Sequence, residues 1–593
     1  MNHPQQSVKL TIPLARRLLQ SHQISAIDLS SYCHALAHYG EESLSLAAFS
    51  HLFDSSHILA QAQESQERFQ EAAKVSTMEG HGGTNGILRP LEGIPMTVKA
   101  NIATRYSNLT ASSQMLKEST PGYDSHVVEQ LKNAGAILIG VTEMDEFGMG
   151  SLGRNATHEK GAARNPLYLG GDNGNGWSMP RQQKVDDWIQ SIKSQTVPQR
   201  TTNSDFHYSA GGSSSGSAVS IAHGSSLASL ATDTGGSIRL PAAWTGIVGF
   251  KPSYGQLSRR GVVSYASSLD TVGIMGNSVA CVADVMNVLR NHGSEDDGEA
   301  IGVHVGDSTA SFGGQSISLS QSTQKQEGLE GIKIGIPAAF CVEECSPHVA
   351  QAWEASIRHL ERYGADIQVV SKDCVRPQTV SDSLPAYYVL TCAEASSNLA
   401  RYDGLRYGMS YDASLKDMVL TFSTSSTILS DLNPRERQYA TVRARGFGPE
   451  VKRRILCGTA VLSSDRFHTH YEAASYIRAL MTQELTNAFR ENKELGSDDK
   501  DEGVDLMLIP TALTHPPNLA GEGGIDPTEA FQNDVMTIPI SLAGLPSISI
   551  PTWLSENENC CPPLVVGMQL FGPRLSEERV LTVANALQYI QPI

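Results

Sequence analysis

Apolar positions follow two different periods along the first 150 residues. Over residues 14–36 they recur at helical spacing, which predicts amphipathic helices. Residues 94–100 and 136–141 are short apolar runs of strand length, and residues 127–131 between them repeat at helical spacing before Gly135. A strand, a helix, a glycine stop and a second buried strand are typical of a partly parallel sheet. The pattern predicts an α/β fold with one large mixed sheet covered on both faces by helices.

The chain is long enough for several domains, yet its pattern favours one. At 593 residues with 40% hydrophobic residues, it can bury a large core, and it contains no internal repeat. Three polar stretches interrupt the pattern, near residues 167–208, 293–329 and 491–503. We predict a single catalytic domain over residues 1–593, with these stretches as solvent-facing insertions.

Composition excludes several classes of function. Lys and Arg number 45 against 62 Asp and Glu, a net charge of −17, so the chain alone is a poor binder of nucleic acid. Nine scattered cysteines without C-x-x-C pairs are typical of a reduced compartment and predict no metal site. No run of 18 apolar residues occurs, so we expect no transmembrane helix and no membrane partner. Residues 1–27 lack acidic residues, as in an organellar presequence, but their helical periodicity favours a place in the fold.

The most unusual segment is residues 211–252, which is rich in glycine and serine but interspersed with apolar residues. Flexible linkers lack such apolar partners, so this backbone is expected to approach another group closely. A phosphate-binding loop is excluded because no lysine occurs between Gly211 and Phe250, and an aspartic protease because the Asp-Thr-Gly triplet occurs only once. A hydrolase elbow at residues 212–216, with Ser214 as nucleophile, stays open as a weaker alternative.

Two serines and one lysine carry a more specific pattern. Ser213 and Ser237 each follow a pair of glycines, and Lys99 lies in an apolar, strand-like run. A lone lysine there would usually extend to solvent or pair with a carboxylate. Together the three residues resemble the amidase signature family, whose Ser-cisSer-Lys triad matches Lys99, Ser213 and Ser237. The resemblance extends over nearly the whole chain.

The residue types suit the cleavage of an amide. Ser237 would attack the carbonyl, Ser213 would relay its proton, and Lys99 would accept it. A lysine can be that base only if burial lowers its pKa from roughly 10.4 to about 7–8. Backbone N–H groups would bind the oxyanion in the loop that contains Thr234, Gly235 and Gly236.

The chain departs from the family's pattern at two positions. Ala100 follows the lysine where the family often has aspartate, and Ser215 replaces a glycine. If the φ angle of Ser215 were positive, the serine would cost about 1 kcal/mol. Neither change affects the triad.

Three segments of the C-terminal half, at residues 387–408, 451–464 and 531–551, resemble the A subunits of glutamyl-tRNA(Gln) amidotransferases within this family. The resemblance implies that Arg454 binds the α-carboxylate of glutamine, since a guanidinium pairs with a carboxylate through two bonds. It implies that Asp534 binds the α-ammonium and that Tyr407 borders the same pocket.

This resemblance also implies a division of labour. The chain would be a glutaminase that supplies ammonia for converting Glu-tRNA(Gln) to Gln-tRNA(Gln) within a heterotrimer. It would need no cofactor of its own. The B subunit would hold ATP, Mg²⁺ and most of the tRNA, and a small C subunit would bridge the two. The long insertions favour a eukaryotic chain, hence the mitochondrial matrix or a plastid. The alternatives are a stand-alone amidase for a small, aryl or fatty amide and, less favoured, a non-catalytic scaffold.

Overall fold

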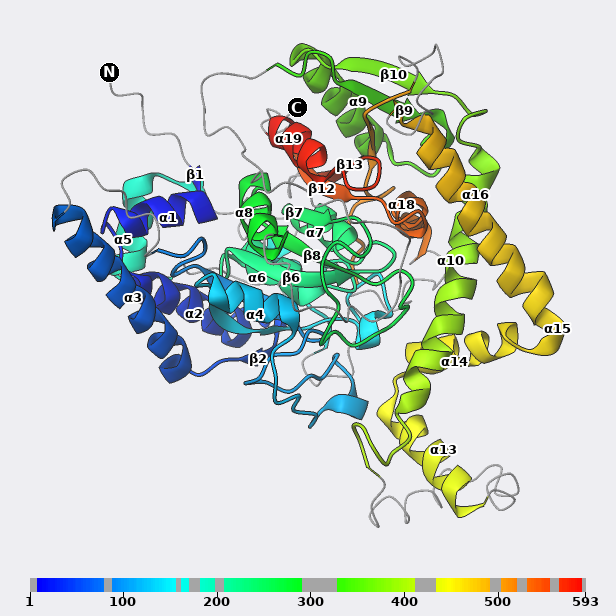
Figure 1. Cartoon of the computed structure of the whole chain (residues 1–593), viewed down its shortest axis with the longest axis horizontal. Coiled ribbons are helices and arrows are strands. Elements are labelled where there is room, and N and C mark those ends of the chain that lie inside the picture. Colours follow the sequence, from blue (N-terminus) through cyan, green and yellow to red (C-terminus); the bar gives the residue numbers. More distant parts are fainter. Residues whose placement is uncertain are drawn as a thin grey trace.

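The computed structural model describes residues 8–78, 88–155, 161–169, 182–197, 207–290, 328–410, 433–490, 503–519, 531–554 and 565–588. An eleven-stranded sheet runs through them in the order β10-β9-β11-β13-β12-β7-β8-β6-β3-β4-β2 (Figure 1). Strand β3 is parallel to both of its neighbours, β4 and β6, whereas β7, β8 and β12 pair antiparallel. The predicted α/β class with one large mixed sheet is therefore confirmed.

The strands are short and mostly buried. Those of the large sheet are β2 (Phe49–Leu52), β3 (Pro95–Lys99), β4 (Ile137–Thr142), β6 (Ala228–Asp233), β7 (Val248–Lys251), β8 (Thr271–Gly276), β9 (Lys333–Pro337), β10 (Asp366–Val370), β11 (Leu506–Pro510), β12 (Ser547–Trp553) and β13 (Val565–Phe571). A separate two-stranded ribbon joins β1 (Val8–Lys9) to β5 (Gln182–Gln183). The strands predicted at 94–100 and 136–141 correspond to β3 and β4.

Two groups of helices cover opposite faces of the sheet. On one face, α6 (Ser215–His223) packs on β3, β4, β6 and β8, next to α7 (Arg239–Thr245). On the other, α8 (Val279–Arg290) packs on β6, β7 and β8, next to α4 (His126–Asn133) and α19 (Glu577–Leu587). The remaining helices of this part are α1 (Ile12–Gln20), α2 (Ala26–Glu42), α3 (Ser55–Met78), α5 (Val185–Lys193), α9 (Pro347–Arg362) and α18 (Ile538–Leu542).

Alternation along β3 separates a polar face from an apolar one. Met96 and Val98 belong to the main hydrophobic core together with α4 and α8. Thr97 points to the other face, where its hydroxyl lies 3.2 Å from that of Ser220 on α6. Successive side chains of a strand point to opposite faces, so Lys99 lies on the α6 side with Thr97. The buried serines of α6 thus pack against a polar surface of the sheet.

The N-terminal helices agree with the predicted periodicity. Helix α1 begins after Thr11, whose side chain accepts a hydrogen bond from the N–H of Leu14. Helix α2 begins with a reciprocal capping box between Ser25 and Asp28. These caps satisfy N–H groups that a helix start leaves without partners.

The predicted insertions are only partly described. Residues 182–197 contain α5, whose Trp188 and Ile192 are buried in the main core. This part of the predicted excursion is therefore anchored to the fold by two apolar side chains, while its polar residues Asp186, Asp187 and Gln190 are exposed. The stretches predicted near 293–329 and 491–503 lie almost entirely outside the described residues.

Along one side of the molecule runs a group of helices that we call the helical arm (Figure 1). It consists of α10 (Pro377–Asn398), α13 (Pro434–Gly446), α14 (Pro449–Val461), α15 (Ser464–Arg466) and α16 (Glu472–Ala488). Helix α10 packs against both α14 and α16, and a second hydrophobic core joins the arm to the sheet domain. None of the helices in the described ranges combines the length and apolar character needed to cross a bilayer.

Candidate active site

Lys99 is the last residue of β3 and is fully buried. Its Nζ lies 2.9 Å from Ser213 Oγ, 2.8 Å from Ser214 Oγ and 3.1 Å from the hydroxyl of Thr232 on β6. Burial lowers the pKa of Lys99 to about 7, although nearby carboxylates, Asp145 foremost, act in the opposite direction. A lysine with this pKa is largely neutral just above pH 7 and can accept a proton.

Ser213 lies in the turn that leads into α6, and the Gly212–Ser213 peptide bond is cis. The resemblance to the amidase signature family implies a cis serine at this position. The turn is held by backbone hydrogen bonds from Asp145 N–H to the Ser213 carbonyl, 3.1 Å, and from Gly212 N–H to the Ser151 carbonyl, 2.9 Å. Both hydroxyls, of Ser213 and Ser214, therefore reach the same amine from a fixed backbone.

Ser237 follows β6 in the loop before α7 and is the one partly exposed member of the predicted triad. Within the described part of the chain its hydroxyl makes no hydrogen bond. Its carbonyl accepts one from Ser214 N–H, at 3.2 Å. The structure thus joins Lys99 to Ser213 directly, and joins Ser237 to the same turn through the backbone.

The loop between β6 and α7 presents unpaired backbone donors. Among the described contacts, the N–H groups of Gly235, Gly236 and Ser237 find no protein acceptor. Because buried N–H groups are almost always paired, three consecutive free ones indicate a site for an anion. Gly236 has a φ of +147°, which only glycine adopts readily.

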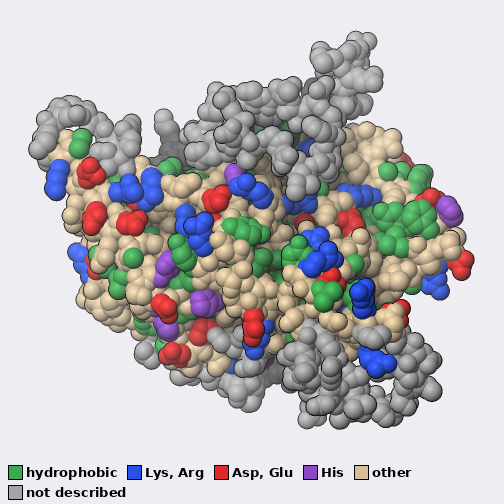
Figure 2. Space-filling view, turned by 60° about the horizontal axis from the view of Figure 1, so that its bottom comes forward, with side chains coloured by type: hydrophobic (Ala, Val, Ile, Leu, Met, Phe, Trp, Pro, Cys, Tyr) green, Lys and Arg blue, Asp and Glu red, His purple; other side chains and the backbone are tan. Residues whose placement is uncertain are grey.

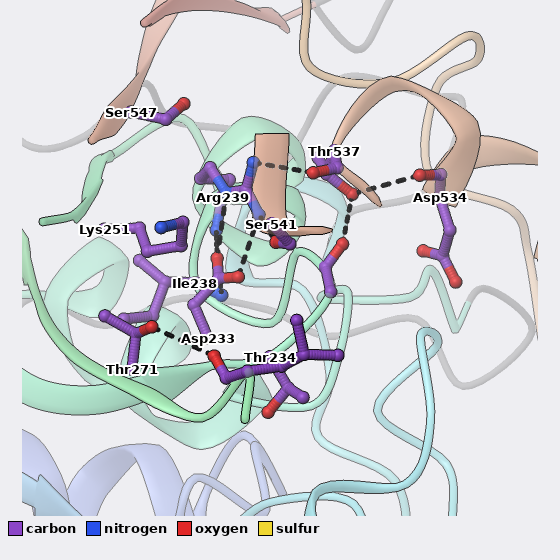
Figure 3. Close-up of polar contacts among 12 residues, drawn as sticks. Asp233, Thr234, Ile238, Arg239, Lys251, Thr271, Asp534, Thr537, Ser541 and Ser547 are labelled. Atoms are coloured by element: carbon purple, nitrogen blue, oxygen red, sulfur yellow. Dashed lines mark hydrogen bonds and ion pairs between the residues drawn. The ribbon is translucent and has the colours of Figure 1, made fainter. Parts of the chain in front are cut away.

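A buried ion pair closes this loop on itself. Asp233 Oδ1 accepts from Arg239 Nη2 at 2.9 Å, and its Oδ2 accepts from the Arg239 Nε at 3.0 Å and from Ile238 N–H at 3.1 Å (Figure 3). Both side chains are fully buried. Two parallel bonds between a guanidinium and a carboxylate fix geometry as well as charge. The two ends of the loop are therefore held in place before any substrate arrives.

Arg454 lies on α14 and is buried against three aromatic rings. Its guanidinium is 5.3 Å from the ring centre of Tyr388, 5.6 Å from that of Tyr265 and 5.9 Å from that of Phe531. Its Nε donates to Glu450 at 2.8 Å and its Nη1 donates to the Tyr265 hydroxyl. Its Nη2 has no acceptor in the described ranges. The arginine is thus anchored on one side and open on the other.

Asp534 lies in the turn η9 (Asn533–Met536) and shares Tyr388 with Arg454. Its Oδ2 accepts from the Tyr388 hydroxyl at 2.9 Å and from Ser151 Oγ at 2.7 Å. No donor in the described structure bonds its Oδ1. Burial raises the pKa of Asp534 to about 6, while these hydrogen bonds and the charge of Arg454 lower it. The carboxylate is therefore ionised at neutral pH and keeps one oxygen free.

Two contacts connect Arg454, Tyr388 and Asp534, which together form the predicted substrate pocket, to the catalytic groups. Ser151 bonds Asp534 with its hydroxyl, and its carbonyl accepts from Gly212, the residue before Ser213. Tyr387, next to Tyr388 on α10, lies so close to Gly235 that a Cβ there would come within 2.5 Å of its hydroxyl. A ligand held by the pocket would therefore lie beside the loop that ends in Ser237.

The structure does not bring Tyr407 to this pocket. Its side chain is 56% exposed in the segment after the arm helix α10, and the contacts that join Arg454 to Asp534 involve Tyr388 instead. Both tyrosines lie in the segment 387–408 that carries the resemblance. The signal for Tyr388 was its place beside Tyr387 in the apolar stretch 384–390, where a buried phenol needs a hydrogen-bond partner.

Sequence reasoning also missed Glu146, whose carboxyl group lies at the start of α14. It accepts from Gly448 N–H at 2.8 Å and from Ser113 Oγ at 2.5 Å. Burial raises the pKa of Glu146 to about 7. This contact ties the helix that carries Arg454 to the turn after Asp145.

The two departures from the family's pattern are readily accommodated. Ser215 is the first residue of α6 and its φ is not positive, so the predicted cost does not arise. Ala100 is buried, and its N–H donates to the carbonyl of Thr142 on β4 at 3.1 Å. In the described ranges no three His, Cys, Asp or Glu side chains are grouped as metal ligands.

Comparisons with known proteins agree with this geometry. A model of the Amidase family matches residues 56–174 and 182–581. The mitochondrial glutamyl-tRNA(Gln) amidotransferase A subunit of Emericella nidulans is 38% identical over 535 residues, covering 88% of this chain and 93% of that protein. The glutamyl-tRNA(Gln) amidotransferase A subunit of an Exiguobacterium species is 37% identical over 527 residues, 89% of this chain and 88% of that one. The crystal structure of the glutamyl-tRNA(Gln) amidotransferase A subunit from Thermotoga maritima aligns with a TM-score of 0.58 at 25% identity, covering 91% of this chain and 94% of that one.

Proposed function

Because the chain belongs to the amidase family, we propose that it is the glutaminase subunit of a glutamyl-tRNA(Gln) amidotransferase. The observation that supports this most is the pocket around Tyr388. Among the contacts of the described residues, it offers one guanidinium nitrogen without an acceptor, on Arg454, and one carboxylate oxygen without a donor, on Asp534. An α-amino acid carries one carboxylate and one ammonium close together, so these two groups match it. A pocket for an aryl or fatty amide would be apolar instead.

Hydrolysis would begin with proton transfer. The neutral amine of Lys99 accepts the proton of Ser213, whose oxygen takes the proton of Ser237. The Ser237 oxygen then attacks the side-chain amide carbon of glutamine. The carbonyl oxygen becomes an oxyanion and is bound by the free N–H groups of Gly235, Gly236 and Ser237.

Ammonia leaves when the tetrahedral intermediate collapses. The C–N bond breaks, and the amine takes a proton back through Ser213 from Lys99. Water, activated by the same pair, then cleaves the ester on Ser237 and releases glutamate. One glutamine and one water thus give one glutamate and one ammonia.

We propose that partner subunits use this ammonia. The relatives are named as subunits of an amidotransferase, and a chain with a net charge of −17 is poorly suited to grip tRNA itself. The B subunit would hold ATP, Mg²⁺ and Glu-tRNA(Gln), and the C subunit would complete the heterotrimer. Several similar relatives are mitochondrial, which supports the mitochondrial matrix as its location, and others are bacterial.

A surface of the arm supports the presence of a partner. Hydrophobic side chains gather at the end of the molecule where α14, α15 and α16 lie (Figure 2). Leu456 is 71% exposed there and Tyr476 67%. Exposed apolar patches of this kind mark surfaces that bind other proteins.

The decisive experiment is co-expression with the B and C subunits of a similar relative. We expect the three chains to co-purify and to convert Glu-tRNA(Gln) to Gln-tRNA(Gln) with glutamine and ATP. Free ammonium should bypass this chain, so a Ser237→Ala complex should work with ammonium and fail with glutamine. A chain that cleaves neutral amides well and ignores glutamine with its partners present would instead be a stand-alone amidase.

A further inference from the structure

Thr537 reaches the catalytic loop from the opposite end of the sequence. It lies between η9 and α18 and is fully buried. Its hydroxyl donates to the carbonyl oxygen of Gly235, about 300 residues earlier in the chain, and the Asp534 carbonyl is a more distant second acceptor at 3.3 Å. Its own backbone N–H donates to the Asp534 carbonyl at 3.1 Å. Figure 3 shows it between Arg239 and Asp534.

The bond to Gly235 sets the direction of a neighbouring donor. In a planar trans peptide, the C=O of one residue and the N–H of the next point in opposite directions. The Gly235 carbonyl points at Thr537, so the Gly236 N–H points away from Thr537. That N–H is one of the three unpaired donors of the loop.

Without such a bond, nothing in the local sequence fixes this peptide. Two adjacent glycines populate both signs of φ, so the Gly235–Gly236 unit can flip at little cost. The flipped unit would present a carbonyl oxygen where the oxyanion must lie. Asp233 and Arg239 fix the two ends of the loop but make no hydrogen bond to this peptide.

We propose that Thr537 is a positioning residue that holds the Gly235–Gly236 peptide in the orientation that aims the Gly236 N–H at the oxyanion. The inference rests on the proposed hydrolysis by Ser237 but not on the identity of the amide. In this role the hydroxyl of Thr537 stabilises the transition state and does not contribute to substrate binding.

The surrounding contacts explain why Thr537 can hold its position. Its carbonyl accepts from Arg239 Nη1 at 3.0 Å, so the same arginine that closes the loop also binds this turn. Arg239 Nη1 further donates to Gln569 Oε1 at 2.7 Å, and Gln569 Nε2 donates to the Met536 carbonyl at 2.9 Å. The turn that carries Asp534 is therefore locked to the oxyanion loop on two sides. A Cβ on Gly236 would come within 2.4 Å of Thr537 Oγ1, so the fit also requires this glycine.

The test uses two matched pairs of variants. Wild type and Thr537→Val have branched side chains, and only threonine can donate. Thr537→Ser and Thr537→Ala have small side chains, and only serine can donate. Each is measured in the complete complex with glutamine and with a neutral amide such as acetamide, and thermal unfolding is followed alongside. If valine prevents folding, the serine and alanine pair still isolates the hydroxyl.

We expect kcat to fall roughly 10- to 100-fold in Thr537→Val and in Thr537→Ala, somewhat less than for removal of an oxyanion donor itself. The fall should be equal for both amides, because both develop the same oxyanion. The KM for glutamine should stay within about twofold, and Thr537→Ser should retain kcat within about threefold of wild type.

Two results would overturn the proposal. Equal kcat values for the serine and alanine variants would show that the hydroxyl has no role. A rise in KM for glutamine alone, with kcat unchanged, would place Thr537 in the amino-acid pocket. Failure of the proposed function is recognised separately, since a wild-type complex that ignores glutamine still allows the comparison with acetamide, and an active Ser237→Ala variant would exclude the nucleophile itself.

Discussion

The catalytic groups and the pocket groups are held in two different ways. Lys99 ends β3 and the loop with Ser237 follows β6, two adjacent strands of the central sheet, while Ser213 lies in the turn before α6 and contacts Lys99. A single buried scaffold therefore fixes all three. Arg454, Tyr388 and Asp534 come from three separate elements, α14, α10 and η9. Under the proposed function, the first region would act on any amide and the second would select glutamine.

This difference implies that the two regions can be separated by mutation. A change in the catalytic region should reduce cleavage of every amide, because all of them pass through the same oxyanion. A change in the pocket should reduce cleavage only of substrates that carry an α-carboxylate and an α-ammonium. Paired measurements on glutamine and a neutral amide therefore test the division directly.

The largest effect is expected for Ser237→Ala. Removal of the nucleophile should lower kcat by several orders of magnitude, roughly 10⁴-fold or more, on both glutamine and acetamide, while the fold stays intact. Steady-state ammonia release and circular dichroism check this. Activity within about tenfold of wild type would exclude Ser237 and favour Ser214, whose hydroxyl also contacts Lys99.

Lys99→Met should lose about as much activity as Ser237→Ala, again on both amides. Methionine keeps the unbranched stem but removes the base. Residues that act as a unit are strongly non-additive, so the double variant should be no worse than either single one. A double variant far less active than both would mean that the lysine and the serine act independently.

In the pocket, Arg454→Ala should act on glutamine alone. It leaves the substrate carboxylate desolvated and unpaired, at a cost of about 2–5 kcal/mol, which is roughly 30-fold or more in kcat/KM. Acetamide hydrolysis should barely change. The neighbouring Arg453 is a matched control, because it also pairs with Glu450 but is exposed, so Arg453→Ala should leave both activities intact. Equal losses on both amides in Arg454→Ala would make this arginine structural.

The same contrast explains what the sequence predicted well. Lys99 lies in a buried run whose period predicts a strand, whereas Ser213 and Ser237 lie in loops that the spacing of the two glycine pairs identifies. Local pattern therefore contains most of the information about the catalytic region. The sheet order and the insertion helix α5 depend on long-range packing that no local period records.

For the pocket, the sequence supplied candidates but not their arrangement. The resemblance to the A subunits implied Arg454 and Asp534, whose charges complement those of an amino acid, and the structure does bring both to Tyr388. Tyr407 was chosen from the same segment as Tyr388, but α10 ends at Asn398 and the chain then turns to the surface. Thr537 was missed because its role depends on a contact with Gly235, far away in the sequence.

The pH dependence should also separate the two regions. Lys99 acts when neutral, so with its pKa near 7 kcat/KM for both amides should fall about tenfold for each pH unit below that value. Asp534 acts when ionised, and its pKa is near 6. Protonation of Asp534 below that value should lower kcat/KM further for glutamine only. The acidic side of the pH profile should therefore be steeper for glutamine than for acetamide. Identical profiles for the two amides would remove Asp534 from substrate binding.

The smallest expected effect tests most closely which tyrosine borders the substrate pocket. Tyr388→Phe keeps the ring beside Arg454 but removes the hydroxyl that donates to Asp534 at 2.9 Å. Ser151 still bonds the same oxygen, so we expect the KM for glutamine to rise only about five- to tenfold, below the roughly 12-fold low end for loss of a hydrogen bond to a charged group. The kcat for acetamide should stay unchanged. Tyr407→Phe removes the same atom from an exposed ring and should change neither value. If Tyr407→Phe raised the KM for glutamine and Tyr388→Phe did not, the pocket would lie along the surface of the arm rather than beside the oxyanion loop.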